Sequence, residues 1–114
     1  MKFMKVVIPS CGGKGKRDKV SDVFAKAPYF TIIDVDGGKI SGVEVKENEV
    51  SSLVQGAGPM VVKLFRDLKA DAVITGDIGP GAKTLIEISG LHLFKVEPGT
   101  KVSDAVQRFF ETRA

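Results

Sequence analysis

The sequence predicts an α/β protein built on a mixed sheet of five strands. Short apolar runs alternate with apolar stripes of helical period through the second half of the chain. In the first half, two segments of alternating polarity flank a Gly37-Gly38 pair. The 114 residues, 43% hydrophobic and 27% charged, suit a single folded domain over residues 1–114.

Three consecutive strands are predicted first. Lys2–Pro9 is a short apolar run that indicates a buried strand. Tyr29–Asp36 and Lys39–Lys46 are predicted to form a hairpin, because Gly37-Gly38 accepts the positive φ of a two-residue turn. The second arm of the hairpin carries fewer apolar residues, which favours an edge strand. Its free edge permits a homodimer.

A helix is predicted from Gly58, with Pro59 at its start, where a missing N–H costs nothing. Its apolar residues recur every three or four positions. The predicted buried stripe comprises Ala57, Met60, Val61, Leu64, Phe65 and Leu68.

The remaining elements alternate strand and helix. Ala72–Thr75 and Leu91–Val96 are predicted strands, and the helix between them begins at Pro80 and ends before Gly90. Thr100 is expected to cap a final helix. That helix is predicted to bury Val102, Ala105, Val106, Phe109 and Phe110.

The predicted element order is β-β-β-α-β-α-β-α. Right-handed crossovers then give a sheet of order 3-2-1-4-5, with the second strand antiparallel and helices on both faces. This is the ribonuclease-H-like arrangement. The carboxyl ends of strands one, three, four and five meet at one edge of such a sheet, where open α/β folds bind ligands.

Two glycine-rich turns are expected at that edge, Gly56-Ala57-Gly58-Pro59 and the turn after Ala72–Thr75. Free amides at a helix start, together with the helix dipole, can hold an anion. A P-loop is excluded because Lys83-Thr84 stands one residue too far from the glycines. The residues predicted to approach or balance an anion are Gly56, Gly58, Gly76, Gly79, Gly81 and Lys83.

The segment Ser10–Val20 is a basic loop. Residues 1–30 hold seven Lys or Arg and two Asp, whereas residues 31–114 hold ten basic and twelve acidic residues. Cys11, with Gly12 and Gly13, precedes these cations, and such surroundings predict a lowered thiol pKa and a thiolate ligand for iron or another soft metal. The plainer interpretation of the charges is a solvated loop. Ser21–Ala25, just beyond, is expected to form one helical turn capped by Ser21.

Several classes of protein are disfavoured. A two-metal nuclease needs several carboxylates at the active edge, but Asp77 is the only acid in the glycine turns there. Nucleophilic catalysis lacks a base, because the sole histidine, His92, begins the fifth strand, at the opposite edge from Cys11. No apolar run approaches the roughly 20 residues of a membrane span. One cysteine excludes an intrachain disulfide and fits a reducing cytoplasm.

Five segments together resemble the dinitrogenase iron-molybdenum cofactor biosynthesis family, the small domain of nitrogenase accessory and cofactor-carrier proteins. They are KVVIP at 5–9, VSDVFAKAPYF at 20–30, GAGP at 56–59, DAVITGDIGP at 71–80 and GTKVSDAV at 99–106. The resemblance implies a ribonuclease-H-like fold and non-catalytic binding of an anionic iron-sulfur or iron-molybdenum cluster. The family's usual segment Ser-Glu-His-Phe-Gly-Arg-Ala has Val23 here in place of its histidine. That substitution leaves Cys11, the glycine-turn amides and Lys26 or Lys83 as contacts.

We therefore expect a cytoplasmic, non-enzymatic carrier of such a cluster, exchanging it with donor or acceptor proteins. One alternative is a metal-free binding or regulatory module for a phosphate-bearing small molecule, using the same amides. Another is an RNA-binding domain led by Lys14–Lys19, although one Tyr and no Trp provide little surface for stacking bases.

Overall fold

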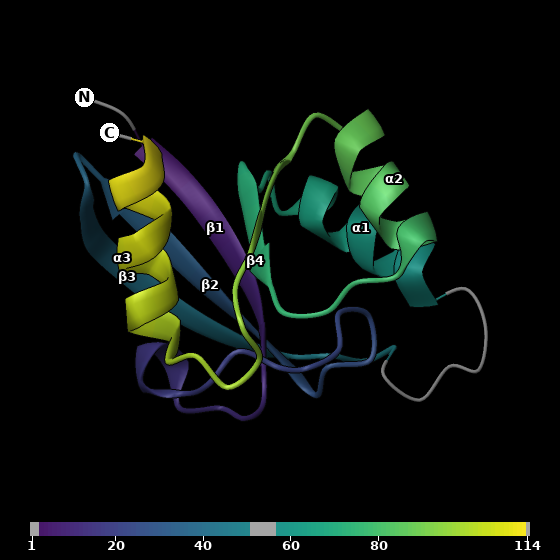
Figure 1. Cartoon of the computed structure of the whole chain (residues 1–114), viewed down its shortest axis with the longest axis horizontal. Coiled ribbons are helices and arrows are strands. Elements are labelled where there is room, and N and C mark those ends of the chain that lie inside the picture. The colour runs from purple at the N-terminus through teal and green to yellow at the C-terminus, as the bar shows by residue number, and fades with distance from the viewer. Residues whose placement is uncertain (1–2, 51–56, 114) are drawn as a thin grey trace.

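The computed structural model describes residues 3–50 and 57–113 (Figure 1). The strands in that part of the chain are β1 (Phe3–Ser10), β2 (Tyr29–Asp36), β3 (Lys39–Glu47), β4 (Ala72–Thr75) and β5 (His92–Lys95). The helices are α1 (Ala57–Asp67), α2 (Pro80–Ile88) and α3 (Val102–Arg113), with a short 3₁₀ turn η1 (Gly15–Arg17).

The sheet has the predicted order, β3-β2-β1-β4-β5. β2 is antiparallel to both of its neighbours, and β1, β4 and β5 are mutually parallel. The carboxyl ends of β1, β3, β4 and β5 therefore meet at one edge, which lies at the bottom of Figure 1. We call this edge the rim.

Each face of the sheet carries its own hydrophobic core, as the alternation along the strands requires. α3 covers one face, whereas α1 and α2 cover the other (Figure 1). On the α1–α2 face, the Phe65 ring packs edge-on against Phe24 and Phe30, with centroids 5.7 and 5.1 Å away. The core under α3 includes Val6, Ile8, Ile33, Val35, Ile74 and Phe109. The opposite core includes Val7, Phe30, Ile32, Val73, Phe65 and Ile86.

The buried stripe of α1 differs from the prediction at two positions. Met60 is 50% exposed, whereas Val62, which the stripe omitted, is only 4% exposed. The reason is that α2 packs beside α1, where a β-carbon on Gly58 would lie 3.7 Å from the Ala82 β-carbon. This contact turns the buried side of α1 toward Val62 and away from Met60.

Two local predictions near the rim are wrong. Ser21–Ala25 does not form a helical turn, although the Ser21 hydroxyl does accept a hydrogen bond from the Val23 amide at 3.2 Å. The Ser21 amide is bonded to the Pro9 carbonyl at 2.9 Å, and the segment that follows consists of bends and a turn. Thr100 does not cap α3, because its hydroxyl donates to the Glu97 carbonyl at 2.6 Å and closes the preceding turn instead.

The hairpin and its edge strand are as predicted. Gly37 and Gly38 have φ of 61° and 85°, which a two-residue turn of this kind requires. β3 pairs only with β2, and Val43 on it is 43% exposed. A register shift opposite Asp34 and Val35 twists this edge.

Candidate binding site at the rim

The basic loop after β1 is held in place by hydrogen bonds among its own residues. The Asp18 carboxylate, only 7% exposed, accepts hydrogen bonds from the backbone amides of Lys14 (3.0 Å) and Lys19 (2.8 Å). The Cys11 amide donates to the Lys19 carbonyl at 3.0 Å and closes the loop at its base. The charged side chains thus extend from a fixed scaffold.

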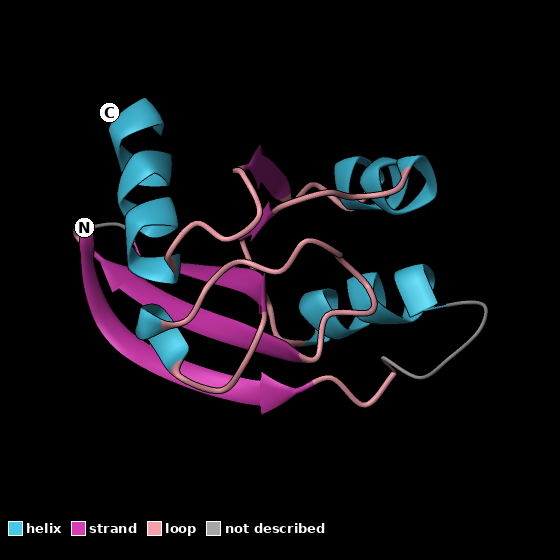
Figure 2. Cartoon of the chain, turned by 60° about the horizontal axis from the view of Figure 1, so that its bottom comes forward, coloured by secondary structure: helices cyan, strands magenta, loops and turns pink. Residues whose placement is uncertain are grey.

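Residues 18–21, which we call the strap, join this loop to the rest of the rim. The Val20 amide donates to the Thr100 carbonyl (2.8 Å), and the Gly99 amide donates back to the Val20 carbonyl (2.9 Å). On the other side, the Ser21 amide donates to the Pro9 carbonyl at 2.9 Å. The strap therefore lies between the end of β1 and the turn after β5, and the loops of the rim cross in front of the sheet (Figure 2).

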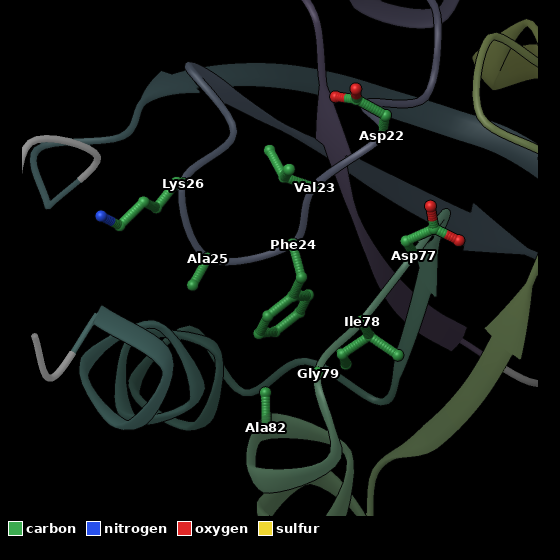
Figure 3. Close-up of a pocket in the computed structure, with 9 residues that line it drawn as sticks. All are labelled: Asp22, Val23, Phe24, Ala25, Lys26, Asp77, Ile78, Gly79 and Ala82. Carbon is green, nitrogen blue, oxygen red and sulfur yellow. The ribbon is translucent and has the colours of Figure 1, made fainter.

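A pocket of about 470 Å³ opens beside the strap, between residues 22–26 and the β4–α2 turn. Figure 3 shows the side chains of Phe24, Ile78 and Ala82 between these two walls, with the carboxylates of Asp22 and Asp77 together on one side. Lys26 points away on the other side. The pocket is lined by Asp22, Val23, Phe24, Ala25, Lys26, Asp77, Ile78, Gly79 and Ala82.

The N-terminus of α2 faces this pocket. Gly79 occupies the N-cap position in an extended conformation, and no side chain caps the helix. Pro80 follows as the first helical residue, and the first amide to bond within the turn is that of Lys83, to the Gly79 carbonyl at 3.0 Å. The amides of Gly81 and Ala82 consequently have no partner within the helix. They and the dipole of the helix favour an anion here.

The predicted glycines have different surroundings. Gly79 lines the pocket, and a β-carbon on Gly79 or Gly81 would meet no atom within 4 Å. Gly76 is buried, and a β-carbon there would lie 2.6 Å from the Ser21 carbonyl oxygen, so the backbone that approaches it is the protein's own. Gly58 faces α2, and Gly56 lies outside the described residues.

The remaining predicted residues do not line the pocket. Lys83 is exposed on the first turn of α2. A β-carbon on Gly12 would lie 2.8 Å from a carboxylate oxygen of Asp18, and one on Gly13 would lie 3.6 Å from the Tyr29 ring. These two glycines allow the loop to pack on itself and on β2.

Cys11 is exposed, and its thiol lies 3.8 Å from the Val20 carbonyl. Partial burial raises its pKa, and the negative charges of Asp18 and Asp22 raise it further, while Lys19 opposes them. The expected lowering of this pKa is therefore wrong. Hydrogen bonds to the loop backbone turn the Asp18 carboxylate inward. Its negative charge therefore affects the thiol more than the positive charges of most neighbouring Lys and Arg side chains do.

The part of the chain that the structure describes holds no group of three or more His, Cys, Asp or Glu side chains placed to bind a metal ion. His92 is exposed at the start of β5, at the edge opposite the rim, as predicted. Within the same described ranges, no helix has the length and hydropathy needed to cross a membrane.

Sequence reasoning missed most of the apolar lining. Phe24, Ile78 and Ala82 line the pocket, yet their sequence pattern resembles that of ordinary core residues. Val23 was distinguished only as the position of the family's usual histidine, and it lies on the pocket wall at 42% exposure. The departure from the family's usual histidine was the one signal in the sequence that pointed to this position.

The sheet order and the pocket at its carboxyl edge place this protein in a class of small ribonuclease-H-like α/β domains with a candidate binding site at the rim. Within that class, the chain belongs to the family described as dinitrogenase iron-molybdenum cofactor, whose model matches residues 4–112. The family resemblance drawn from the sequence segments is thereby confirmed.

The chain is also similar to individual proteins over nearly its whole length. A Thermotoga protein named as a candidate NifB protein is 34% identical, with a TM-score of 0.76 over 96% of this chain and 90% of that one. The apo form of the orange protein from Desulfovibrio gigas is 24% identical and shares the fold, with a TM-score of 0.86 over 96% and 89% of the two chains. An uncharacterised protein of Methanocaldococcus jannaschii is 24% identical over 111 residues, 97% of this chain and 89% of the relative.

Proposed function

We propose that this protein is a non-enzymatic carrier that binds a metal-sulfur cluster, or a related anionic cofactor, in the rim pocket. The observation that carries the proposal is the uncapped N-terminus of α2, which opens onto an apolar pocket at the carboxyl edge of the sheet. The family description, which refers to an iron-molybdenum cofactor, supports this kind of cargo.

The donor set fits a preassembled cluster better than a bare ion. Because the described residues include no three-ligand group, the protein would contribute few metal ligands of its own. The amides of Gly81 and Ala82 would hydrogen-bond the anion, and Phe24 and Ile78 would cover its apolar sides. Asp22 and Asp77 repel negative charge on their side of the pocket, so the charge of the cargo would lie toward the N-terminus of α2.

Cys11 remains the proposed thiolate ligand, although it stands outside the pocket lining. The thiol lies 3.8 Å from the carbonyl of Val20, two residues before Asp22 of the pocket wall, and the charge of Asp22 contributes to the raised pKa of the thiol. These observations support a thiol near the mouth of the pocket. Because that pKa is raised, ligation would require the metal to displace the thiol proton. Binding through Cys11 should therefore strengthen as the pH rises.

A metal-free module for a phosphate-bearing small molecule is the second candidate. It uses the same amides of α2 and needs neither Cys11 nor a group of metal ligands. The raised pKa of Cys11 and the absence of a three-ligand group in the described residues favour this alternative.

The two candidates separate in an anaerobic binding experiment. Wild type and Cys11→Ala are mixed with iron and sulfide, or with a synthetic iron-sulfur cluster whose thiolate ligands exchange, and retained metal is measured after desalting. Stoichiometric retention by the wild type supports the carrier. Loss in Cys11→Ala identifies the thiolate ligand, whereas unchanged retention assigns the cluster to the pocket amides. Retention of no metal by the wild type from either source contradicts the carrier, and phosphate binding followed by ³¹P NMR then tests the second candidate.

Val23→Trp and Val43→Trp are a matched pair for locating the cargo. The two valines are 42% and 43% exposed, but only Val23 lines the pocket. Trp at 23 should fill the pocket and reduce retained cargo, whereas Trp at 43, on the edge strand, should leave it unchanged. Equal retention by both variants would place the cargo elsewhere.

A further inference from the structure

Gly76 lies where three separate segments of the rim come together. It directly follows β4 and is buried. A β-carbon at this position would lie 2.6 Å from the Ser21 carbonyl oxygen and 3.1 and 3.5 Å from the Cγ and Cα atoms of Pro98. The strap on one side and the turn after β5 on the other thus leave room for a hydrogen atom but not for a methyl group.

The Ser21 carbonyl that Gly76 touches cannot yield easily, because it belongs to hydrogen-bonded backbone. The Ser21 amide is bonded to the Pro9 carbonyl, and Val20, one residue earlier, exchanges bonds with Thr100 and Gly99. Farther along the same segment, the Asp18 carbonyl accepts from the Val102 amide at 2.8 Å, at the first residue of α3. A methyl group at position 76 would therefore push the strap and the β4–α2 turn apart as units.

Both walls of the pocket begin next to this contact. Asp22 follows Ser21 and starts the wall of residues 22–26, while Asp77 follows Gly76 and starts the opposite wall. We propose that Gly76 is a positioning residue, which sets the separation of the two pocket walls through its contact with the Ser21 carbonyl and does not itself touch the cargo. The part of this inference that concerns cargo rests on the function proposed above; the part that concerns the walls does not.

The wild-type protein provides a first test by amide hydrogen exchange. If the strap supports the wall, the Val20, Ser21 and Gly99 amides should exchange as slowly as those of β4. Exchange of these three amides at the rate of exposed loop residues would overturn the proposal, because a loose strap would accommodate a methyl group. This measurement remains decisive even if Gly76→Ala does not fold.

Gly76→Ala provides the second test, with Val106→Ala as a control that weakens the core under α3 at the end near Gly38 and Ile40, away from the rim. In Gly76→Ala, amide chemical shifts should change throughout residues 22–26 and 97–100, and exchange at Val20 and Ser21 should accelerate about tenfold relative to β4. In Val106→Ala, residues 22–26 and 97–100 should keep their exchange rates relative to β4. Gly79→Ala, which adds a methyl group in open space, should shift only its neighbours. Wild-type-like shifts in residues 22–26 of Gly76→Ala would overturn the proposal.

The cargo experiment is interpreted separately. Where the wild type retains the iron-sulfur cluster, Gly76→Ala should lose about tenfold in affinity, more than Val106→Ala at equal stability. Equal affinity of Gly76→Ala and wild type would overturn the positioning role. If the wild type retains no cluster, the proposed function fails, and the exchange and chemical-shift results still decide the role of Gly76.

Discussion

The loop of residues 11–20 and the turn of residues 76–82 are alike in sequence and different in structure. Each follows a buried strand and carries glycines, and Lys83 directly follows the turn as lysines follow the first glycines of the loop. The loop folds back on itself around Asp18, and side chains of Asp18, Tyr29 and Val43 use the space that its glycines provide. The turn is packed only at Gly76, while Gly79 and Gly81 face open space beside the pocket.

This difference moves the candidate site from one region to the other. A glycine after a strand provides space either for a ligand or for another part of the chain, and sequence alone does not distinguish the two. In the loop, burial and then the charge of Asp18 raise the pKa of the one cysteine, and the backbone amides of Lys14 and Lys19 are already bonded. No side chain caps the start of α2, and its first amides have no partner within the helix. The turn is therefore the region where we propose that an anion binds.

The largest expected effect comes from removing the acid that organises the loop. Asp18→Ala deletes two hydrogen bonds to a carboxylate and leaves the Lys14 and Lys19 amides without their acceptor. We expect the free energy of unfolding, measured with urea, to fall by about 2–3 kcal/mol. Asp36→Ala, at an exposed position, should change it by less than about 0.5 kcal/mol. A similarly small effect for Asp18→Ala would mean that the loop is solvated, as its charge pattern suggested.

A smaller effect is expected from Gly12→Ala. The added methyl group would lie 2.8 Å from Asp18 Oδ2, which accepts from the Lys14 amide, while the Lys19 amide holds the other oxygen of the same carboxylate. The free energy of unfolding should fall by about 1–2 kcal/mol. In an Asp18→Ala background the same substitution should cost much less, since the atom it collides with is gone. Additive losses in the double variant would show that the two residues do not act together.

The fold could be predicted almost completely from sequence, because periodicity and turn glycines act locally. The bounds of β2 and β4 and the first residue of α2 agree with the prediction residue by residue. Errors arose where a distant segment decided the outcome. The burial of Met60 and Val62 depended on the position of α2, and the conformation at Ser21 depended on its hydrogen bond to Pro9.

The site was predicted less well for the same reason. The rim and Gly79 followed from topology and from the start of α2. The lining residues Phe24 and Ile78 come from two loops whose approach no local pattern encodes. The raised pKa of Cys11 depended first on its burial and then on which way Asp18 faces, and hydrogen bonds within the loop decided the second.

A substitution in the open part of the turn should raise the free energy of unfolding, whereas substitutions in the packed loop lower it. Gly81 lies in the first turn of α2, its φ is not positive, and a β-carbon there would meet nothing within 4 Å. Gly81→Ala should raise the free energy of unfolding by about 0.5–1 kcal/mol, because alanine restricts the unfolded chain and favours helix. A loss of stability in urea unfolding would show that position 81 is packed, as position 76 is.

The smallest expected effect concerns the negative charge of Asp22, which lies between the loop of residues 11–20 and the turn of residues 76–82 in the chain. Negative charge at Asp22 disfavours the Cys11 thiolate, so Asp22→Asn should lower the pKa of the thiol and increase the thiolate fraction at pH 7.5. Alkylation by iodoacetamide should then accelerate about twofold, and no more, because burial is the larger cause of the raised pKa. Asp36→Asn, on the hairpin at the far edge, should leave the rate unchanged. An unchanged rate in Asp22→Asn would mean that the field of Asp22 does not reach Cys11, and would remove the argument that places this thiol at the mouth of the pocket.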